Sequence, residues 1–242
     1  MELVVRNVQT LISTLKAICK LVPEVTISAS KEGLEIFGAA HDHLVLVHGV
    51  MKAPFFENYE CSQNDKATIC LESRAVESVM SRILTSDSIQ IELSSTTLVA
   101  RLNKPYKRRF SLKGKQQWEA PPKFRELKYY TECSIDPKVF REIIIDATKT
   151  SDELSIQVFK NRLLFEAHGP FCEFVHEQEM KNNEFIEHVS NTIMISLLSL
   201  ITPLIRECES VFLKISKDMP LSLCLILDPR YASVELIFST RN

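Results

Sequence analysis

The stretch that decides the fold is SIDPKVFREIIIDATKTSDELSIQVFKNRLLFEA, which runs from Ser134 to Ala167. Asp136 followed by Pro137 is a favourable pair for the N-cap and the first position of a helix. Apolar residues then recur at the spacing of a helix with one buried face: Val139, Phe140, Ile143, Ile144 and Ala147. After a polar turn, LSIQVF and RLLFEA follow the two-residue period of half-buried strands. The stretch therefore predicts a helix that begins near residue 137 and a β-hairpin after it.

The same order of helix and hairpin occurs four times along the chain. Helix-like segments begin near residues 9, 73, 137 and 196, so the unit repeats about every 60 residues. The three further helix strings are VQTLISTLKAICKLV, SRAVESVMSRIL and ISLLSLITPLIREC. Each unit also has a strand on either side, for example Leu44–Met51 and Phe171–Met180. One unit is therefore βαβββ.

Four such units pair naturally into two similar domains. The segment KGKQQWEAPPKFRELK, Lys113–Lys128, is polar, contains Pro-Pro and interrupts the strand pattern. We therefore expect a first domain over 1–114, a connector over 115–127 and a second domain over 128–242. The connections within units are mostly short hairpins, which predict antiparallel sheets with helices on one face. The expected fold class is α+β.

Composition limits the classes of function. The chain has 242 residues and is 45% hydrophobic, which is enough for a substantial core. Its net charge of −2 excludes a basic field over the whole protein, so any contact with nucleic acid must be local. The cysteines are odd in number and form no C-x-x-C, which is typical of reduced thiols. No signal-peptide pattern or membrane-length apolar run is present, and we expect a soluble intracellular protein.

No motif of an enzyme or a metal site stands out. Phosphate-binding glycine loops and the G-x-S-x-G and H-E-x-x-H patterns do not occur. His41 and His43 could share one strand face, but no further ligands complete a zinc site. Cys172 and His176 lie too far apart along a strand to act as nucleophile and base, and Cys172 is expected in the core. We expect no catalytic residue, no metal and no cofactor.

Positive charge is concentrated on the predicted helices. The basic positions on these segments are Lys16, Lys20, Arg74, Arg82, Lys138, Arg141, Lys149 and Arg206. They outnumber the acids of the same segments, which are Glu77, Glu142, Asp146 and Glu207. If the helices lined one surface, that surface could bind phosphates without reading sequence. The pattern alone is equally consistent with ordinary solvated helix faces.

The unit order and several strings resemble the sliding DNA clamps over essentially the whole chain. The strings are EVTISASKEGLEIFGAAHDHLVLVHGVMKAPFFENYE, SIDPKVFREIIIDATKTSDELSIQVF and SVFLKISKDMPLSLCLIL with VELIFST. The KDMPL hairpin resembles that of proliferating cell nuclear antigen. MELVVRNV, KAPFFENY and SDELSIQ are more similar to the Rad-nine-type subunit of the heterotrimeric checkpoint clamp, the nine-one-one complex.

The resemblance implies a ring of three chains with helices around a central hole and sheets outside. The eight basic helix positions would line the hole and contact the phosphates of double-stranded DNA. Pro203 departs from the unbroken last helix of the family, which affects the register of Arg206. The resemblance further implies a non-enzymatic nuclear protein that tethers DNA-damage checkpoint and repair proteins. The alternative is a homotrimeric replication clamp, a processivity factor for DNA polymerase.

Partners follow from the same resemblance. They are two other clamp subunits, a clamp loader, and repair or replication proteins that dock short peptide motifs. The matching pocket positions are His43, Leu44, Trp118, Phe124, Leu236 and Phe238. The connector is short and basic here, so ordinary ligands of the replication clamp are expected to bind differently or not at all. A Rad-nine-type chain normally continues into a long phosphorylated tail, which this sequence, ending at Asn242, does not contain.

The most basic run, KPYKRRFSLKGK, is expected at a subunit joint rather than on DNA. As a strand it places Phe110 and Leu112 on one face, and Lys107, Arg109 and Lys113 on the other. The resemblance implies that this edge strand pairs with the acidic strand FCEFVHEQEM of a neighbouring chain. The expected interface residues are Lys107, Arg108, Arg109, Phe110, Glu173, Phe174, Glu177 and Glu179. The alternative is a charged edge that merely prevents aggregation.

Overall fold

The computed structural model describes residues 1–40, 44–61, 66–84, 88–103, 106–115, 127–129, 131–179 and 188–239. These residues form four helices at the predicted places: α1 (Val8–Leu21), α2 (Ser73–Met80), α3 (Pro137–Thr148) and α4 (Ile195–Ile205). A short 3-10 helix, η1, spans Ala53–Phe55. Among the described residues, no helix is long and apolar enough to cross a membrane.

The strands of the first half are β1 (Glu2–Val4), β2 (Glu24–Ser30), β3 (Gly33–Ala39), β4 (Val45–Lys52), β5 (Asn58–Glu60), β6 (Ala67–Glu72), β7 (Ile89–Leu93), β8 (Thr97–Leu102) and β9 (Arg108–Lys113). Those of the second half are β10 (Thr131–Ile135), β11 (Glu153–Val158), β12 (Arg162–His168), β13 (Glu173–Glu179), β14 (Val189–Met194), β15 (Ser210–Ile215), β16 (Leu221–Asp228) and β17 (Ala232–Phe238). Apart from β5, they follow the predicted βαβββ order four times.

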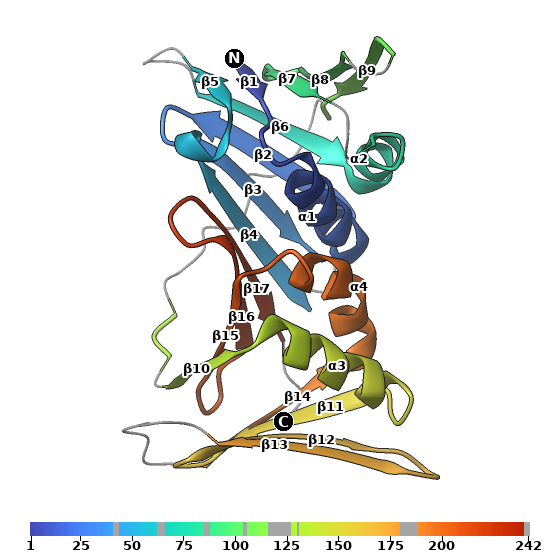
Figure 1. Cartoon of the computed structure of the whole chain (residues 1–242), viewed down its shortest axis with the longest axis vertical. Coiled ribbons are helices and arrows are strands. Elements are labelled where there is room, and N and C mark those ends of the chain that lie inside the picture. The colour runs from blue at the N-terminus through green and yellow to red at the C-terminus, as the bar shows by residue number, and fades with distance from the viewer. Residues whose placement is uncertain are drawn as a thin grey trace.

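Within the described residues, the strands form three antiparallel sheets. The orders are β5-β1-β7-β8-β9, then β10-β15-β16-β17-β4-β3-β2-β6, and finally β13-β12-β11-β14. The central sheet contains strands from both halves of the chain, because β17 of the second half pairs with β4 of the first. In this pairing Leu236 lies opposite Val47. Figure 1 shows the three sheets following one another along the long axis of the molecule.

The units of each half exchange their first strands. β1 pairs with β7, the first strand of the meander β7-β8-β9 of the second unit, while β6 pairs with β2 of the first unit. In the second half, β10 pairs with β15 and β14 pairs with β11 in the same way. Each half is therefore two interlocked βαβββ units, and this confirms the predicted α+β fold class with two similar halves.

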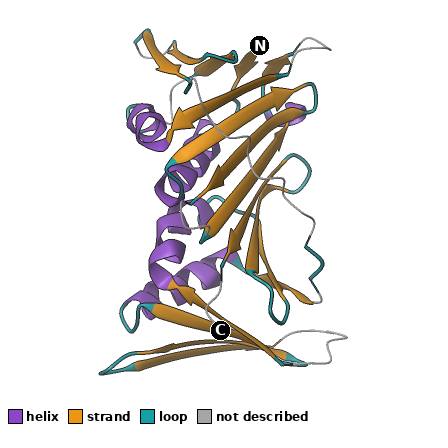
Figure 2. Ribbon diagram, turned by 180° about the vertical axis from the view of Figure 1, so that it is seen from behind, coloured by secondary structure: helices purple, strands orange, loops and turns teal. Residues whose placement is uncertain are grey.

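The helices lie in one layer on one face of the sheets, as Figure 2 shows. α2 packs against α1, α1 against α4, and α4 against α3, so the layer is continuous across both halves. Alternation along the strands explains the core: the side chains on the helix-facing side are buried, including Ile36, Val47 and Val234. A side chain at Gly49, in the same row, would meet Ile18 of α1.

Two sequence features, the N-cap of α3 and the proline inside α4, affect the hydrogen bonds of these helices. The Asp136 carboxylate accepts hydrogen bonds from the N–H groups of Lys138 and Val139, as expected of an N-cap. Pro203 cannot bond the carbonyl of Ser199, but the Thr202 hydroxyl donates to that oxygen at 2.8 Å. α4 therefore continues through the proline to Ile205.

α2 is shorter than predicted. The sequence pattern extends to Leu84, whereas the helix ends at Met80. Beyond it the chain tightens, because Arg82 and Ile83 donate to carbonyls only three residues back, those of Val79 and Met80.

Candidate nucleic-acid interface and subunit edges

The basic positions predicted to face DNA are all on the helix layer or at the ends of its helices. Lys20, Arg74, Arg82, Lys138, Lys149 and Arg206 are exposed, and Lys16 and Arg141 are half-buried. Lys16 and Lys20 are one turn apart and therefore share a face of α1. Since α1 packs on β2 and is flanked by α2 and α4, its solvent face points away from the sheets. The cations of α1 thus lie on the open side of the helix layer.

Most of these cations are free to meet an external anion. Lys149 is the exception, because its ammonium lies 2.9 Å from the Asp146 carboxylate. In the part of the chain that the structure describes, no other basic position of this set forms an ion pair. Of the two middle helices of the layer, α4 is neutral: it contains only apolar residues, serine, threonine and proline, and Arg206 follows its last turn. The charge is therefore spread thinly, with two lysines on α1 and the rest towards the flanks.

β9 and β13 are edge strands at opposite ends of the molecule. β9 is the last strand of the sheet that begins with β5, and β13 is the first strand of the sheet that ends with β14. Figure 1 shows β9 at one extreme of the long axis and β13 at the other. Along β9, Arg109, Ser111 and Lys113 are exposed and alternate with half-buried residues. Along β13, Glu173, Val175, Glu177 and Glu179 are exposed in the same way. The division of faces predicted for the basic strand is confirmed, and β13 shows the same alternation.

The two edges carry opposite charge with different degrees of pairing. Glu177 lies 3.4 Å from Arg162, and Glu173 lies 3.7 Å from His168, while Glu179 has no such neighbour among the described residues. On the basic edge, Arg108 donates to the carbonyl of Arg82 at 2.9 Å and ties β9 to the end of α2. Phe110 and Phe174, the apolar members of the predicted interface, turn inward and pack against the core. The charged members therefore form the exposed part of each edge.

The structure describes three of the six positions predicted for the partner-peptide pocket: Leu44, Leu236 and Phe238. His43, Trp118 and Phe124 lie outside the described residues. Leu44 is half-exposed, and its carbonyl accepts a hydrogen bond from the N–H of Ser239. Leu236 and Phe238 are fully buried and point towards the helices, so their assignment to a surface pocket was wrong. The reason is the two-residue period of β17, which puts Glu235 and Ile237 on the outer face instead.

Sequence reasoning missed a polar cluster on that outer face. The Glu235 carboxylate accepts hydrogen bonds from the Lys214 ammonium at 3.2 Å and from the Ser222 hydroxyl at 2.7 Å. Burial lowers the pKa of nearby His48, which stacks on Phe37 with ring centroids 4.6 Å apart. The signal that could have found the cluster is alternation: these residues occupy the strand positions between the buried ones.

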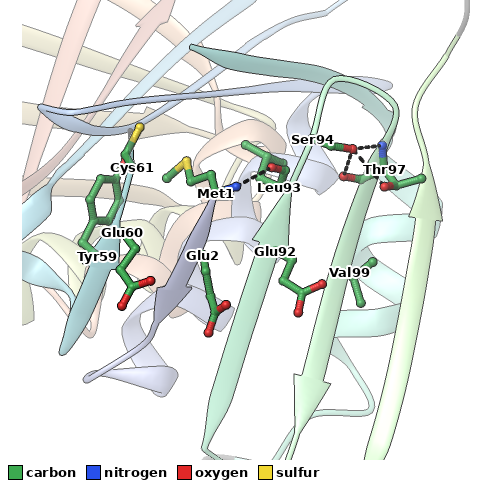
Figure 3. A pocket seen from close by; sticks show the side chains of 10 residues that line it. All are labelled: Met1, Glu2, Tyr59, Glu60, Cys61, Glu92, Leu93, Ser94, Thr97 and Val99. Carbon is green, nitrogen blue, oxygen red and sulfur yellow. Dashed lines mark hydrogen bonds between the residues drawn. The ribbon is translucent and has the colours of Figure 1, made fainter. Parts of the chain in front are cut away.

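A hollow of about 810 Å³ lies on the outer face of the first sheet. Figure 3 shows Glu60, Glu2 and Glu92 in its floor, from the adjacent strands β5, β1 and β7. The register places each directly opposite the next. Each carboxylate has a partner, respectively Asn58, Gln90 and Arg101. Across the described ranges, no three or more His, Cys, Asp or Glu side chains, these glutamates included, are arranged so that they could hold a metal ion.

Cys172 corrects a sequence expectation. It is exposed rather than in the core, because it lies in the turn before β13 begins at Glu173. His176 turns inward towards Phe165, with ring centroids 6.1 Å apart. None of the seven cysteines forms a disulfide in the described structure, and burial raises the pKa of Cys19 and Cys208 to about 12.

Comparisons with known proteins support one family. No family model matches the chain. The DNA polymerase sliding clamp of Methanothermobacter thermautotrophicus is 22% identical over 228 residues, which are 93% of this chain and 91% of that protein. The DNA polymerase sliding clamp of Nitrosopumilus maritimus is 26% identical over 180 residues, 73% of this chain and 70% of the relative.

Solved structures give the same fold. Proliferating cellular nuclear antigen from Entamoeba histolytica superposes with a TM-score of 0.86 at 12% identity, covering 100% of this chain and 98% of that one. The PCNA2-PCNA3 complex from Sulfolobus tokodaii gives 0.86 at 15% identity, with coverage of 100% and 99%. The chain has the sliding-clamp fold.

Proposed function

We propose that this chain is a non-enzymatic subunit of a ring-shaped sliding clamp that encircles double-stranded DNA. The observation that carries the proposal is the continuous layer α2-α1-α4-α3, which spans both halves and carries unpaired cations on its open side. Scattered lysines and arginines on helices suit contacts to phosphates, which hold a duplex without reading its bases. A thin lining also suits sliding, because no contact is strong enough to fix one position.

The assembly follows from the architecture. The two halves, proposed as domains over 1–114 and 128–242 with a connector over 115–127, carry the edge strands β9 and β13 at opposite ends of the chain. A chain with one free edge at each end can join two neighbours head to tail, and rings arise when the rotation closes. In a ring, the helix layer lines the hole and the sheets form the outer wall. Loading by a clamp loader and tethering of peptide-bearing replication or repair proteins belong to the same proposal.

Of the two candidate roles, replication and checkpoint signalling, the replication role is the better supported. Both relatives compared above are named as DNA polymerase sliding clamps. The string KAPFFENY, which is similar to the checkpoint type, has a packing explanation: Phe55 and Phe56 are buried and meet edge to face with ring centroids 5.6 Å apart. That string is therefore accounted for without a checkpoint partner.

A checkpoint subunit, active in the nucleus in damage signalling and repair, is the second candidate. The basic composition of the connector favours it, because the sequence there differs from the acidic and apolar connector of replication clamps. Sizing of the pure chain with mass measurement separates the two. A stable trimer supports the replication type, and a monomer supports a subunit of a mixed ring.

The DNA contact is tested by reversing the charges on α1. Lys16→Glu with Lys20→Glu should abolish retention of the loaded protein on circular DNA, because like charges would then face the phosphates. The matched control is Lys31→Glu with Lys217→Glu, the same change in exposed turns between strands. Replacing both α1 lysines by Gln should lower the slope of log affinity against log salt by about 0.9 for each phosphate that is no longer neutralised. Full retention by the α1 variant would refute the assignment of the helix layer to DNA.

A further inference from the structure

The basic run contains a motif that its place at a subunit edge does not explain. The segment from Arg108 to Leu112 reads R-R-F-S-L, and it holds the only pair of adjacent arginines in the sequence. A serine with arginines two and three residues before it and an apolar residue after it is the pattern that arginine-directed serine kinases recognise. Such kinases select substrates by charge, because acidic side chains in their cleft bind the guanidinium groups. A subunit edge needs positive charge, but it needs no fixed spacing between arginine and serine.

Ser111, the serine of this motif, is accessible in the folded chain. It is exposed on β9, and its hydroxyl has no hydrogen-bond partner among the described residues. Gly114 donates to the carbonyl of Thr96, and hydrogen-bonded pairs alternate along an antiparallel ladder. The N–H and C=O groups of Ser111 therefore point away from β8, towards the open side of the edge strand. A kinase binds its substrate segment in an extended conformation, which β9 already has.

The flanking side chains differ in how easily a kinase reaches them. Arg109 shares the exposed face of Ser111 and forms no ion pair within the described part of the chain. Arg108 and Leu112 are half-buried, and Arg108 donates to the carbonyl of Arg82. They become available when β9 lifts from β8, and as an edge strand β9 is held on one side only. Arg109 therefore makes the first contact, and the release of β9 limits the rate.

A phosphate on Ser111 would change the charge of this edge. Arg109 and Lys113 lie on the same face, each about 7 Å along the strand from Ser111. A phosphoserine carries about −1.5 to −2 charges at pH 7 and three acceptor oxygens, so it would bind these two cations and cancel their charge. In the proposed ring, the exposed glutamates of β13 would then meet a phosphate where they otherwise meet cations.

We infer that Ser111 is a phosphorylation site for an arginine-directed serine kinase, and that its phosphate keeps the chain out of the ring. The inference rests on the proposed ring and adds a modification site and its regulation. In the reaction, the Ser111 Oγ forms a bond to the γ-phosphorus of ATP, and the bond from that phosphorus to the β,γ-bridging oxygen breaks. ADP leaves with the electron pair, and the hydroxyl proton passes to the catalytic base of the kinase. Because the proposed ring covers β9, the kinase acts on the free chain.

The first test is whether the folded chain is modified at Ser111. The chain is incubated with ATP and the catalytic subunit of cyclic-AMP-dependent kinase, an arginine-directed serine kinase, and the site is mapped by tandem mass spectrometry. Glu177→Arg with Glu179→Lys weakens the joint from the other strand and leaves β9 unchanged, so this variant presents Ser111 whether or not the wild-type chain closes rings. Phosphate uptake should be the same in the two chains if the wild type is a monomer, and slower by about 10-fold or more in the wild type if it forms rings.

Matched variants identify the residues that direct the kinase. Ser111→Ala should abolish phosphate uptake. Arg109→Lys keeps the charge but loses the planar guanidinium, and it should slow uptake by about 10-fold or more. Ser134→Ala is the control and should leave uptake unchanged, because Ser134 is exposed on β10 but has no arginine in the three positions before it.

The second test measures assembly after modification. Phosphorylated and unmodified wild-type chains are compared by sedimentation velocity, in a trimer of the chain alone or in a mixed ring with its partner subunits, as sizing directs. Phosphorylation should weaken assembly by about 10-fold or more, and treatment with a phosphatase should restore it. Ser111→Glu should act in the same direction as the phosphate. Ser111→Gln, which has the same size without the charge, should assemble normally.

The outcomes separate this inference from the proposed function. A folded chain that takes up no phosphate at Ser111, or a phosphorylated chain that assembles as well as the unmodified one, overturns the inference. Retention of unmodified rings on circular DNA would then still support the sliding clamp. Conversely, unmodified rings that never stay on circular DNA overturn the proposed function, while phosphate uptake at Ser111 and its effect on assembly would stand.

Discussion

Leu236→Ala should destabilise the whole chain, because Leu236 lies at the seam between its halves, the pairing of β17 with β4. Leu236 is 0% exposed and lies between Leu223 of β16 and Val47 of β4 in the register of the central sheet. Truncation of a fully buried leucine costs about 2–5 kcal/mol, because the removed atoms leave a cavity that the surroundings fill only in part. The enclosed position at the seam places the expected loss of stability at about 3–4 kcal/mol.

The loss is large enough to measure by scanning calorimetry. For a chain of this size, 1 kcal/mol shifts Tm by roughly 2–4 °C, so Leu236→Ala should lower Tm by about 6–16 °C. Leu84→Ala is the matched control, since that side chain is 55% exposed and should cost less than about 1 kcal/mol. A shift no larger than that of the control would refute the core placement and return Leu236 to the surface pocket predicted from sequence. The transition should also remain single, because the central sheet joins both halves.

Three further predictions concern α3 and the thiols. Asp136→Ala should lower stability by about 1 kcal/mol in thermal unfolding, because the two capping hydrogen bonds of Asp136 are lost. Asp136→Asn should cost little, because asparagine also caps helices. Equal losses in the two variants would show that the cap does not stabilise α3. At pH 8, a disulfide reagent should modify exposed Cys172 in the native protein, while Cys19 and Cys208 should react only after unfolding. Burial raises the pKa of both from 9.0 to about 12, so the folded state keeps protons that the unfolded state releases, and stability should fall as pH rises from 9 to 12. Replacement of Cys208 by Ala should make stability fall less steeply with pH. An unchanged dependence on pH would contradict the raised pKa of Cys208 as its cause.

Much of the fold could be predicted because its signals are local and repeated. The N-cap at Asp136, the helical spacing of α3 and the alternation of the hairpins each specify one element. Their fourfold repetition specifies the architecture. The edge positions of β9 and β13, by contrast, are implied by the resemblance to the sliding clamps, and the alternating charges of both strands agree with them.

The errors arise where a prediction depends on a single position or on distant partners. The resemblance implies that Leu236 and Phe238 line a surface pocket, but a one-residue change of parity moves a strand residue from one face to the other, and both side chains are buried. Cys172 is expected in the core because the predicted strand begins two residues before the observed one. Alternation places Lys214, Ser222 and Glu235 on the outer face of their strands, but it does not indicate that side chains from three strands meet there.

The exchange of first strands has a consequence for how the chain folds. β1 is synthesised long before its partner β7, which begins at Ile89, and β10 must wait for β15, which begins at Ser210. A βαβββ unit released alone would therefore leave its meander unpaired at one edge, and the smallest part able to fold is a pair of units. β17, near the end of the described chain, closes the central sheet last. Such long-range pairing predicts slow folding, and it makes a stalled or truncated chain prone to pair its open edges with the wrong neighbour.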